Sequence, residues 1–218
     1  SGPQAALSGR PVGWTLLDHD VAVIEANSLA LSYADGLMNL NMALAVHPTS
    51  GEVSVVGTDA INEVRFEPIV AGVFTRTHLA RFPAASPATV TLGDLNTHLD
   101  YSSATVAQGE RDKSLADPRG IVWNAAGTRA YVTGMGSNNV VVLDAGGARA
   151  GLAPTIEVGQ GPTGIACDGA RNQRTDLVAA FGGNQPELGG MAADRIAELR
   201  SGADQPVARD HQHQACLG

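Results

Sequence analysis

Short apolar runs separated by turn-forming residues recur along the chain. Within residues 117–144 three runs stand out, at 120–123, 130–133 and 140–143, and each is bounded by Gly, Asn, Asp or Pro. Similar runs predict strands at 20–25, 30–33, 42–46, 53–57, 64–66 and 73–79. Short runs with tight turns between them are typical of antiparallel sheets. The pattern therefore predicts an all-β fold.

One unit of this pattern repeats at a regular spacing. Residues 20–25, 62–67 and 139–144 each have a polar start, a β-branched centre and an acidic end, and Val21 lies 43 residues before Val64. Residues 118–121 and 162–165 align without gaps at a spacing of 44. A period of this length with about four short strands is typical of a β-propeller blade.

The number of copies predicts an incomplete ring. Residues 20–172 supply about three four-stranded blades, whereas closed propellers have about four to eight. The chain is therefore expected to be a partial β-propeller with open sheet edges. Missing blades, or a partner, would be needed to close the ring.

Two segments depart from the repeat. An excess of 33 residues before the third copy predicts a loop insertion at 83–116, and long loops within compact domains are often functional. After residue 172 the period is lost. Residues 177–181 could be a displaced strand, and residues 191–199 have helical spacing. The predicted organisation is a partial propeller at 1–172 and a divergent tail at 173–218, irregular or with a short helix.

Several motifs carry a family resemblance. They are Tyr131-Val132-Thr133, the turn at 127–129, the strand at 138–144 and the link at 158–166. These motifs resemble the YVTN-type β-propeller family, named for its Tyr-Val-Thr-Asn core, with Gly134 where the family has Asn. The resemblance is good over 117–172 and fair over 20–79, about two thirds of the chain.

The resemblance implies an exported bacterial protein, in the periplasm or outside the cell, although this chain carries no signal peptide and begins at Ser1. We therefore expect a fragment or a processed product. Propellers with a long insertion ending in Asp-Pro-Arg-Gly, here residues 117–120, look like those fused to di-haem domains of the cytochrome c peroxidase type. A haem c group could thus belong to the parent protein. No Cys-x-x-Cys-His motif occurs in this chain, so no cofactor is expected within it.

Three function classes follow. The first is a non-catalytic platform that docks a ligand or protein. The alternative is the propeller portion of a periplasmic c-type haem oxidoreductase whose haem domain lies outside this chain. The third, a propeller hydrolase with a central metal, would need carboxylates from several blades. Glu25, Glu67 and Asp144 recur at strand ends, but such residues are usually turn formers. No residues are assigned as catalytic.

The composition limits the classes of binding partner that can be expected. The net charge is −8 and only 17% of the 218 residues are charged, with no basic patch of the kind that binds nucleic acid. No apolar run approaches the roughly 18 residues that span a membrane. The ligand or protein partner is not identified by the sequence.

The insertion holds the candidate binding residues. Asp94, Asn96, His98 and Asp100 alternate, so an extended conformation would place them on one face, next to Tyr101. Oxygen and imidazole groups can hold a divalent cation. Calcium-loop spacing is not met, however, so no metal ligand is assigned, and a solvated loop with Asx turns is the alternative. We predict that these five residues form a binding surface.

Other motifs have simpler interpretations. His211, His213 and Cys216 are one ligand short of a tetrahedral zinc site. Gly159, Gly161 and Gly164 spell G-x-G-x-x-G, but strand-like residues follow instead of a helix, so a linker between blades is predicted. The remaining expectations are a surface turn at residues 18–20, packing of Trp123 and Tyr131 between blades, and a small buried side chain at Cys167.

Overall fold

The computed structural model describes residues 19–60, 75–101, 106–151, 155–168, 175–181 and 196–200. Its strands are β1 (Val21–Ile24), β2 (Leu31–Ala34), β3 (Leu40–Val46), β4 (Glu52–Ala60), β5 (Thr75–Pro83), β6 (Thr91–Asp94), β7 (Pro118–Trp123), β8 (Arg129–Gly134), β9 (Asn139–Asp144), β10 (Ile156–Glu157), β11 (Gly164–Asp168), β12 (Thr175–Phe181) and β13 (Ile196–Arg200). One short helix, α1 (Gln108–Arg111), lies between β6 and β7.

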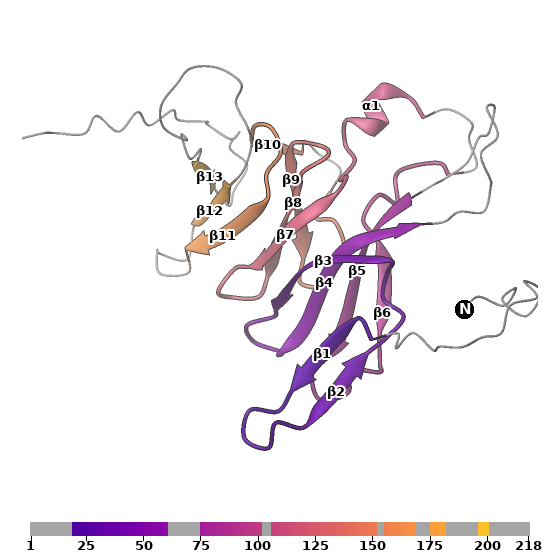
Figure 1. Ribbon diagram of the computed structural model, residues 1–218. Coiled ribbons are helices and arrows are strands. Elements are labelled where there is room, and N and C mark those ends of the chain that lie inside the picture. The colour runs from indigo at the N-terminus through magenta and orange to yellow at the C-terminus, as the bar shows by residue number, and fades with distance from the viewer. Residues whose placement is uncertain are drawn as a thin grey trace, which may run out of the picture.

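The strands form four antiparallel sheets (Figure 1). The first sheet contains β1 and β2, the second β3 to β6, the third β7 to β10 and the fourth β11 to β13. Neighbours in each sheet follow one another in the chain, because the turns between strands are mostly short. The prediction of an all-β fold is confirmed.

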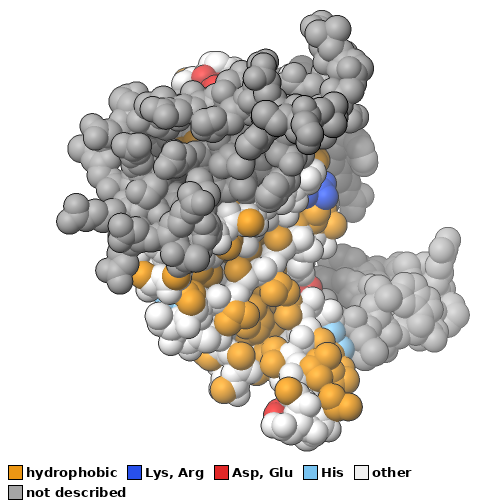
Figure 2. Space-filling view, turned by 90° about the vertical axis from the view of Figure 1, so that its left-hand side faces the viewer, with side chains coloured by type: hydrophobic (Ala, Val, Ile, Leu, Met, Phe, Trp, Pro, Cys, Tyr) orange, Lys and Arg blue, Asp and Glu red, His pale blue; other side chains and the backbone are white. Residues whose placement is uncertain are grey.

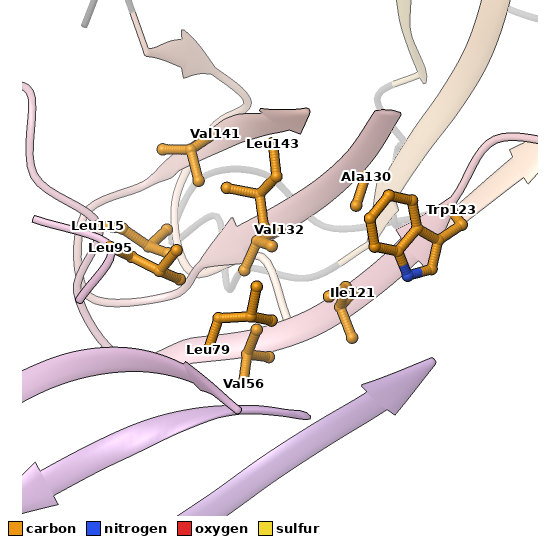
Figure 3. Close-up of a cluster of buried hydrophobic side chains, with 10 residues drawn as sticks. All are labelled: Val56, Leu79, Leu95, Leu115, Ile121, Trp123, Ala130, Val132, Val141 and Leu143. Atoms are coloured by element: carbon orange, nitrogen blue, oxygen red, sulfur yellow. The ribbon is translucent and has the colours of Figure 1, made fainter. Parts of the chain in front are cut away.

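Both faces of the second and third sheets contribute buried side chains, because adjacent residues of a strand point to opposite faces. Val53 and Val55 belong to a hydrophobic cluster shared with the first sheet, whereas Val56 belongs to the cluster shared with the third sheet. The second of these clusters also contains Leu79, Leu95, Leu115, Ile121, Trp123, Ala130, Val132, Val141 and Leu143 (Figure 3). Each large apolar side chain buried in this way contributes roughly 1.5–3 kcal/mol. Stacking therefore holds the sheets together face to face.

The second, third and fourth sheets approach one another most closely at their first strands. Strand β7 contacts β3 and β4 on one side and β11 on the other. A Cβ atom at Gly120 of β7 would stand 2.9 Å from Ile165 Cγ2 and 3.0 Å from Thr133 Oγ1. A glycine is therefore needed where β7 meets β11.

The second and third sheets repeat one another in detail. Each first strand has a bulge near its start, at Met42 in β3 and at Arg119 in β7. The pairs Ala43–Val56 and Gly120–Thr133 follow the two bulges at the same place. This places the two copies 77 residues apart along their first two strands.

The third strands show where the repeat was misassigned. Val56 pairs with Leu79 in the second sheet, and Thr133 pairs with Val140 in the third. The third strand of the second sheet is thus β5 and not the copy of the repeat that was expected at 62–67. Residues 62–67 lie outside the described part of the chain. Part of the extra length therefore precedes β5, and not all of it lies in 83–116.

The insertion is more ordered than a structureless loop. Its residues 91–94 form β6, which completes the second sheet, and its residues 108–111 form α1. Leu95 and Leu115 are 2% and 1% exposed in the core. The expectation of a loop without secondary structure was wrong, because a few apolar residues in a polar segment are enough to bury its ends.

The structure of the tail agrees with the prediction in one segment and differs in another. The displaced strand at 177–181 is confirmed as part of β12. The helix expected at 191–199 is wrong for its described part, because residues 196–200 form β13 and pair with β12. Strand β11, before residue 172, pairs with β12, after it, so one sheet crosses the expected boundary.

Candidate binding surface on the insertion

Asn96 anchors the insertion to the sheets. Its Nδ2 donates to the carbonyl of Leu115 at 2.8 Å, and its Oδ1 accepts from the amide of Leu115 at 2.8 Å. Thr77 of β5 donates its hydroxyl to the same carbonyl at 2.9 Å. Asn96 is 5% exposed. Its side-chain amide forms two hydrogen bonds with the backbone of Leu115, as a residue of a neighbouring strand would. The hydrogen-bonding groups of the Asn96 side chain are therefore already used within the protein and not directed at a ligand.

Asp94 ends the strand that carries it. Its Oδ1 accepts from the amide of Asn96 at 2.7 Å, and residues 95–98 form turns. Such an Asx turn reverses the chain direction. The extended conformation that would align Asp94, Asn96, His98 and Asp100 on one face is therefore wrong.

His98 and Tyr101 contact different parts of the structure. His98 Nε2 is 3.0 Å from the carbonyl of Glu110, at the end of α1. The Tyr101 ring lies under the Arg76 guanidinium, 4.5 Å from its carbon. Burial and a hydrogen bond with Asp94 raise the pKa of Tyr101, so its hydroxyl stays protonated. Asp100 is exposed to solvent.

Sequence reasoning missed two side chains that border this surface. Arg76 and His78 lie on one face of β5, within the strand predicted at 73–79, but the sequence did not link them to the insertion. His78 is paired across the sheet with Asp94, and Arg76 with Asp59. Only strand pairing could have revealed these neighbours, since they are distant in sequence.

Arg149 ties the third sheet to the insertion. One guanidinium nitrogen donates to the carbonyls of Lys113 at 2.8 Å and Leu95 at 3.4 Å. Burial lowers the pKa of Arg149. No sequence pattern singled out this residue, because its partners are main-chain atoms.

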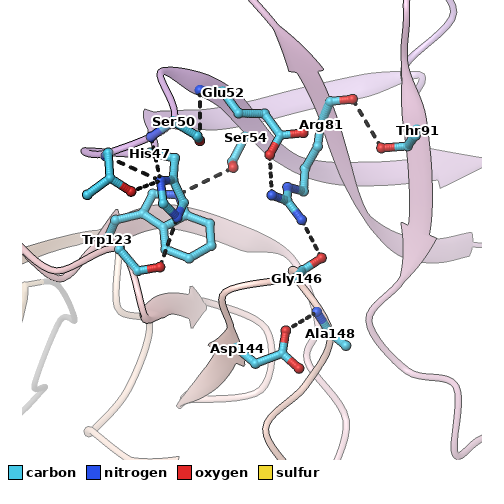
Figure 4. Close-up of polar contacts among 12 residues, drawn as sticks. His47, Ser50, Glu52, Ser54, Arg81, Thr91, Trp123, Asp144, Gly146 and Ala148 are labelled. Atoms are coloured by element: carbon cyan, nitrogen blue, oxygen red, sulfur yellow. Dashed lines mark hydrogen bonds and ion pairs between the residues drawn. The ribbon is translucent and has the colours of Figure 1, made fainter.

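His47 and Arg81 are among the polar side chains that join the second sheet to the third (Figure 4). His47 Nε2 lies 2.8 Å from the carbonyl of Gly127, and its ring packs against Trp123. The His47 Nδ1 accepts from the amide of Ser50 at 3.2 Å, so the proton resides on Nε2. Arg81 donates both to Glu52 and to the carbonyl of Gly146.

Several simpler interpretations are confirmed. Glu25 accepts from the amides of Asn27 and Ser28, and Asp144 accepts from Ala148, so both acidic residues form turns. Trp123 and Tyr131 pack between sheets, on opposite faces of the third sheet. Residues 159–161 form a linker that leads into β11.

Other predicted groups have different outcomes. His19 stacks on Tyr33 with ring centroids 3.8 Å apart and contacts Asp35 at 2.9 Å, at a surface position. Cys167 is partly buried against the hydrophobic cluster between the third and fourth sheets. His211, His213 and Cys216 lie outside the described residues.

The surface offers hydrogen bonds and charge to a partner. Its exposed residues include the acidic Asp100 and Asp112 and the basic Arg111. In the ranges that the structure describes, no three His, Cys, Asp or Glu side chains gather as a metal site would require. Binding by Asp94, Asn96, His98, Asp100 and Tyr101 stays a prediction, with Asn96 and Asp94 already engaged locally.

Comparison with known proteins bears on the fold. No protein-family model matches the chain, and no curated protein sequence matches it. Among solved structures it is similar to Kuenenia stuttgartiensis hydrazine synthase, with a TM-score of 0.52 and 12% sequence identity. The match covers 81% of this chain and 49% of the other, so this chain spans about half the length of that one. Within the described residues, no helix is both long and apolar enough to cross a bilayer.

Proposed function

We propose that this chain is a partial β-propeller of the YVTN type and acts as a rigid docking platform in an exported bacterial protein. The observation that carries this proposal is the anchoring of the insertion. Asn96, Leu95 and Leu115 fasten both of its ends to the core. Recognition loops set on a rigid scaffold lose little entropy when they bind.

The fold supports the propeller interpretation. The sheets stack face to face, their strands follow in chain order, and β3, β7 and β11 lie successively along one side (Figure 1). The blades of a propeller are arranged in this way around its central axis. The proposed ring is incomplete in this chain, so the remaining blades would come from a longer polypeptide or a partner.

The binding side is proposed to be the rim formed by Asp100, His98 and Tyr101. Asp100 is exposed, while His98 and Tyr101 are partly buried and held by Glu110 and Arg76. This combination presents fixed side chains to a ligand or protein. The Ser114 hydroxyl lies 3.3 Å from His98 Nε2, but that nitrogen donates to the carbonyl of Glu110 and so is not placed as a base for Ser114, which favours docking over catalysis.

Site-specific photo-crosslinking tests the proposal. A photoreactive residue would replace Asp100 in one variant and Ala85, exposed in the β5–β6 turn, in a control. In cells that express the natural protein, we expect adducts to a specific partner at position 100 several-fold above those at position 85. Equal labelling at both positions would show that the rim formed by Asp100, His98 and Tyr101 is not a docking surface.

A further inference from the structure

The first sheet has an edge that no described strand covers. In the described part of the chain β1 pairs only with β2, whereas the second and third sheets have four strands each. The amide of Glu25 donates to Ala30 at 3.0 Å, so residues 21, 23 and 25 face β2 in the alternating ladder. The amides and carbonyls of Ala22 and Ile24 therefore point to the open edge.

An apolar strip of the second sheet lies bare beside this edge. Leu44 and Val46 of β3 pair with Val55 and Val53, which pack against the first sheet. Val55 and Val53 are 1% and 7% exposed, but Leu44 and Val46 are both 55% exposed. The first sheet thus covers the side chains of β4 on this face but leaves those of β3 exposed.

Hydrophobic side chains are visible on this side of the molecule (Figure 2). Ile24, at the end of β1, is 59% exposed, and its cross-strand neighbour Leu31 is 56% exposed. Both lie on the face of the first sheet opposite to Val21 and Val23, which pack against the second sheet. An apolar strip next to an open strand edge favours the addition of another strand. A strand with alternating apolar residues would suit both the edge and the strip.

The sequence just before β1 has this character. Val12, Trp14 and Leu16 alternate with smaller or polar residues, and only residues 18–20 separate this segment from β1. We propose that the β1 edge and the Leu44–Val46 strip are the docking surface for residues 12–17, added as an antiparallel strand. Three residues are enough for a hairpin connection.

The same order of elements occurs in the third sheet. There β8 precedes β9 by four residues and pairs along the edge of β9 that corresponds to the open edge of β1. A short tether also gives residues 12–17 an effective concentration in roughly the millimolar range. A second copy of the chain at micromolar concentration competes poorly with such a segment.

Amide hydrogen exchange of the full chain, measured by NMR, tests this docking. The amides of Ala22 and Ile24 should be protected in the natural chain. Trp14→Asp should lower their protection at least about tenfold, while the amide of Val56 reports that the core remains folded. Thr15→Asp, one position away on the other face of the segment, should change the protection of Ala22 and Ile24 much less.

Two results would overturn the proposal. One is exchange of Ala22 and Ile24 in the natural chain at the rate of an open strand edge. The other is protection that rises with protein concentration, which would assign the edge to a second copy.

Ala22→Pro is a second check, because it removes an edge amide without removing a bond to β2. It should release Ile24 as Trp14→Asp does.

Discussion

His47 shows how single polar residues join these sheets. It binds its own turn through Nδ1 and the neighbouring sheet through Nε2, while its ring covers Trp123. Asn96 acts similarly between the insertion and Leu115. Buried polar groups with all their partners present add directionality to apolar packing. Sequence reasoning recognised neither role, since the partners are backbone groups far along the chain.

Two glycines provide a matched test of the His47 contact. Gly51 and Gly127 have φ angles of +71° and +68° in corresponding turns. A Cβ atom at Gly51 meets nothing within 4 Å, whereas one at Gly127 would stand 2.8 Å from His47 Nε2. Gly51→Ala should cost about 1 kcal/mol for the left-handed backbone alone. Gly127→Ala should cost about 3 kcal/mol because it also displaces His47.

Urea denaturation measures this difference. The expected result is a clearly lower midpoint for Gly127→Ala than for Gly51→Ala, with similar slopes. Equal losses for the two variants would mean that His47 does not pack on the 124–129 turn.

Asn96 gives a second prediction at this scale. Asn96→Ala leaves the amide and carbonyl of Leu115 without their side-chain partner, so we expect a loss of about 2–3 kcal/mol in unfolding free energy. Asn96→Asp keeps the acceptor for the Leu115 amide but loses the donor. Asp100→Ala, at an exposed position, should change stability by less than about 0.5 kcal/mol. Thermal or urea unfolding of the three variants would show whether Asn96 is structural.

At the scale of elements, local patterns predicted strands well and pairings poorly. The strands at 20–25, 30–33, 53–57 and 130–133 could be found because each has a short apolar run between turn residues. Strand β6 was missed, since Thr91 to Asp94 has no buried side chain and is specified by its pairing with β5. Strand β13 was missed because an isolated apolar run fits either period.

The insertion can be tested as an element through its two leucines. Leu95 and Leu115 enter one cluster from the two ends of the insertion (Figure 3). Either Leu→Ala substitution should cost about 3 kcal/mol. The double variant should lose less than the sum, by about 1 kcal/mol, because the two side chains share one cavity. Additive losses in a double-mutant cycle would argue that the two ends are anchored independently.

The β1–β2 turn should respond to acid. Hydrogen bonds from the amide and hydroxyl of Ser28 lower the pKa of Glu25 below its ordinary value of 4.5. A lowered folded-state pKa means that the carboxylate stabilises the turn above the ordinary value, and that this contribution is lost as the pH falls through the folded-state value. NMR should show the amides of Asn27 and Ser28 shifting below pH 4.5 with an apparent pKa under that of a free Glu. Glu25→Gln should abolish this shift, and its persistence would assign it to another group.

For the whole molecule, the repeat predicted stacked antiparallel sheets but not their full register. The 44-residue spacing of Gly120 and Gly164 corresponds to the starts of β7 and β11. The 43-residue spacing of Val21 and Val64 does not mark equivalent strands, because the third strand of the second sheet begins only at Thr75. Insertions of similar composition can precede either strand, so spacing alone cannot place them.

The central claim is that the insertion is a fixed part of the stacked sheets and can therefore present a docking surface. Residue-level hydrogen exchange tests this claim directly at the amides of Leu95 and Leu115. These amides bind Thr77 O and Asn96 Oδ1, both at 2.8 Å. We predict that they open with free energies within about 1 kcal/mol of those for Val56 and Val132 in the sheets. Exchange of Leu95 and Leu115 at the rate of an open loop would contradict the account.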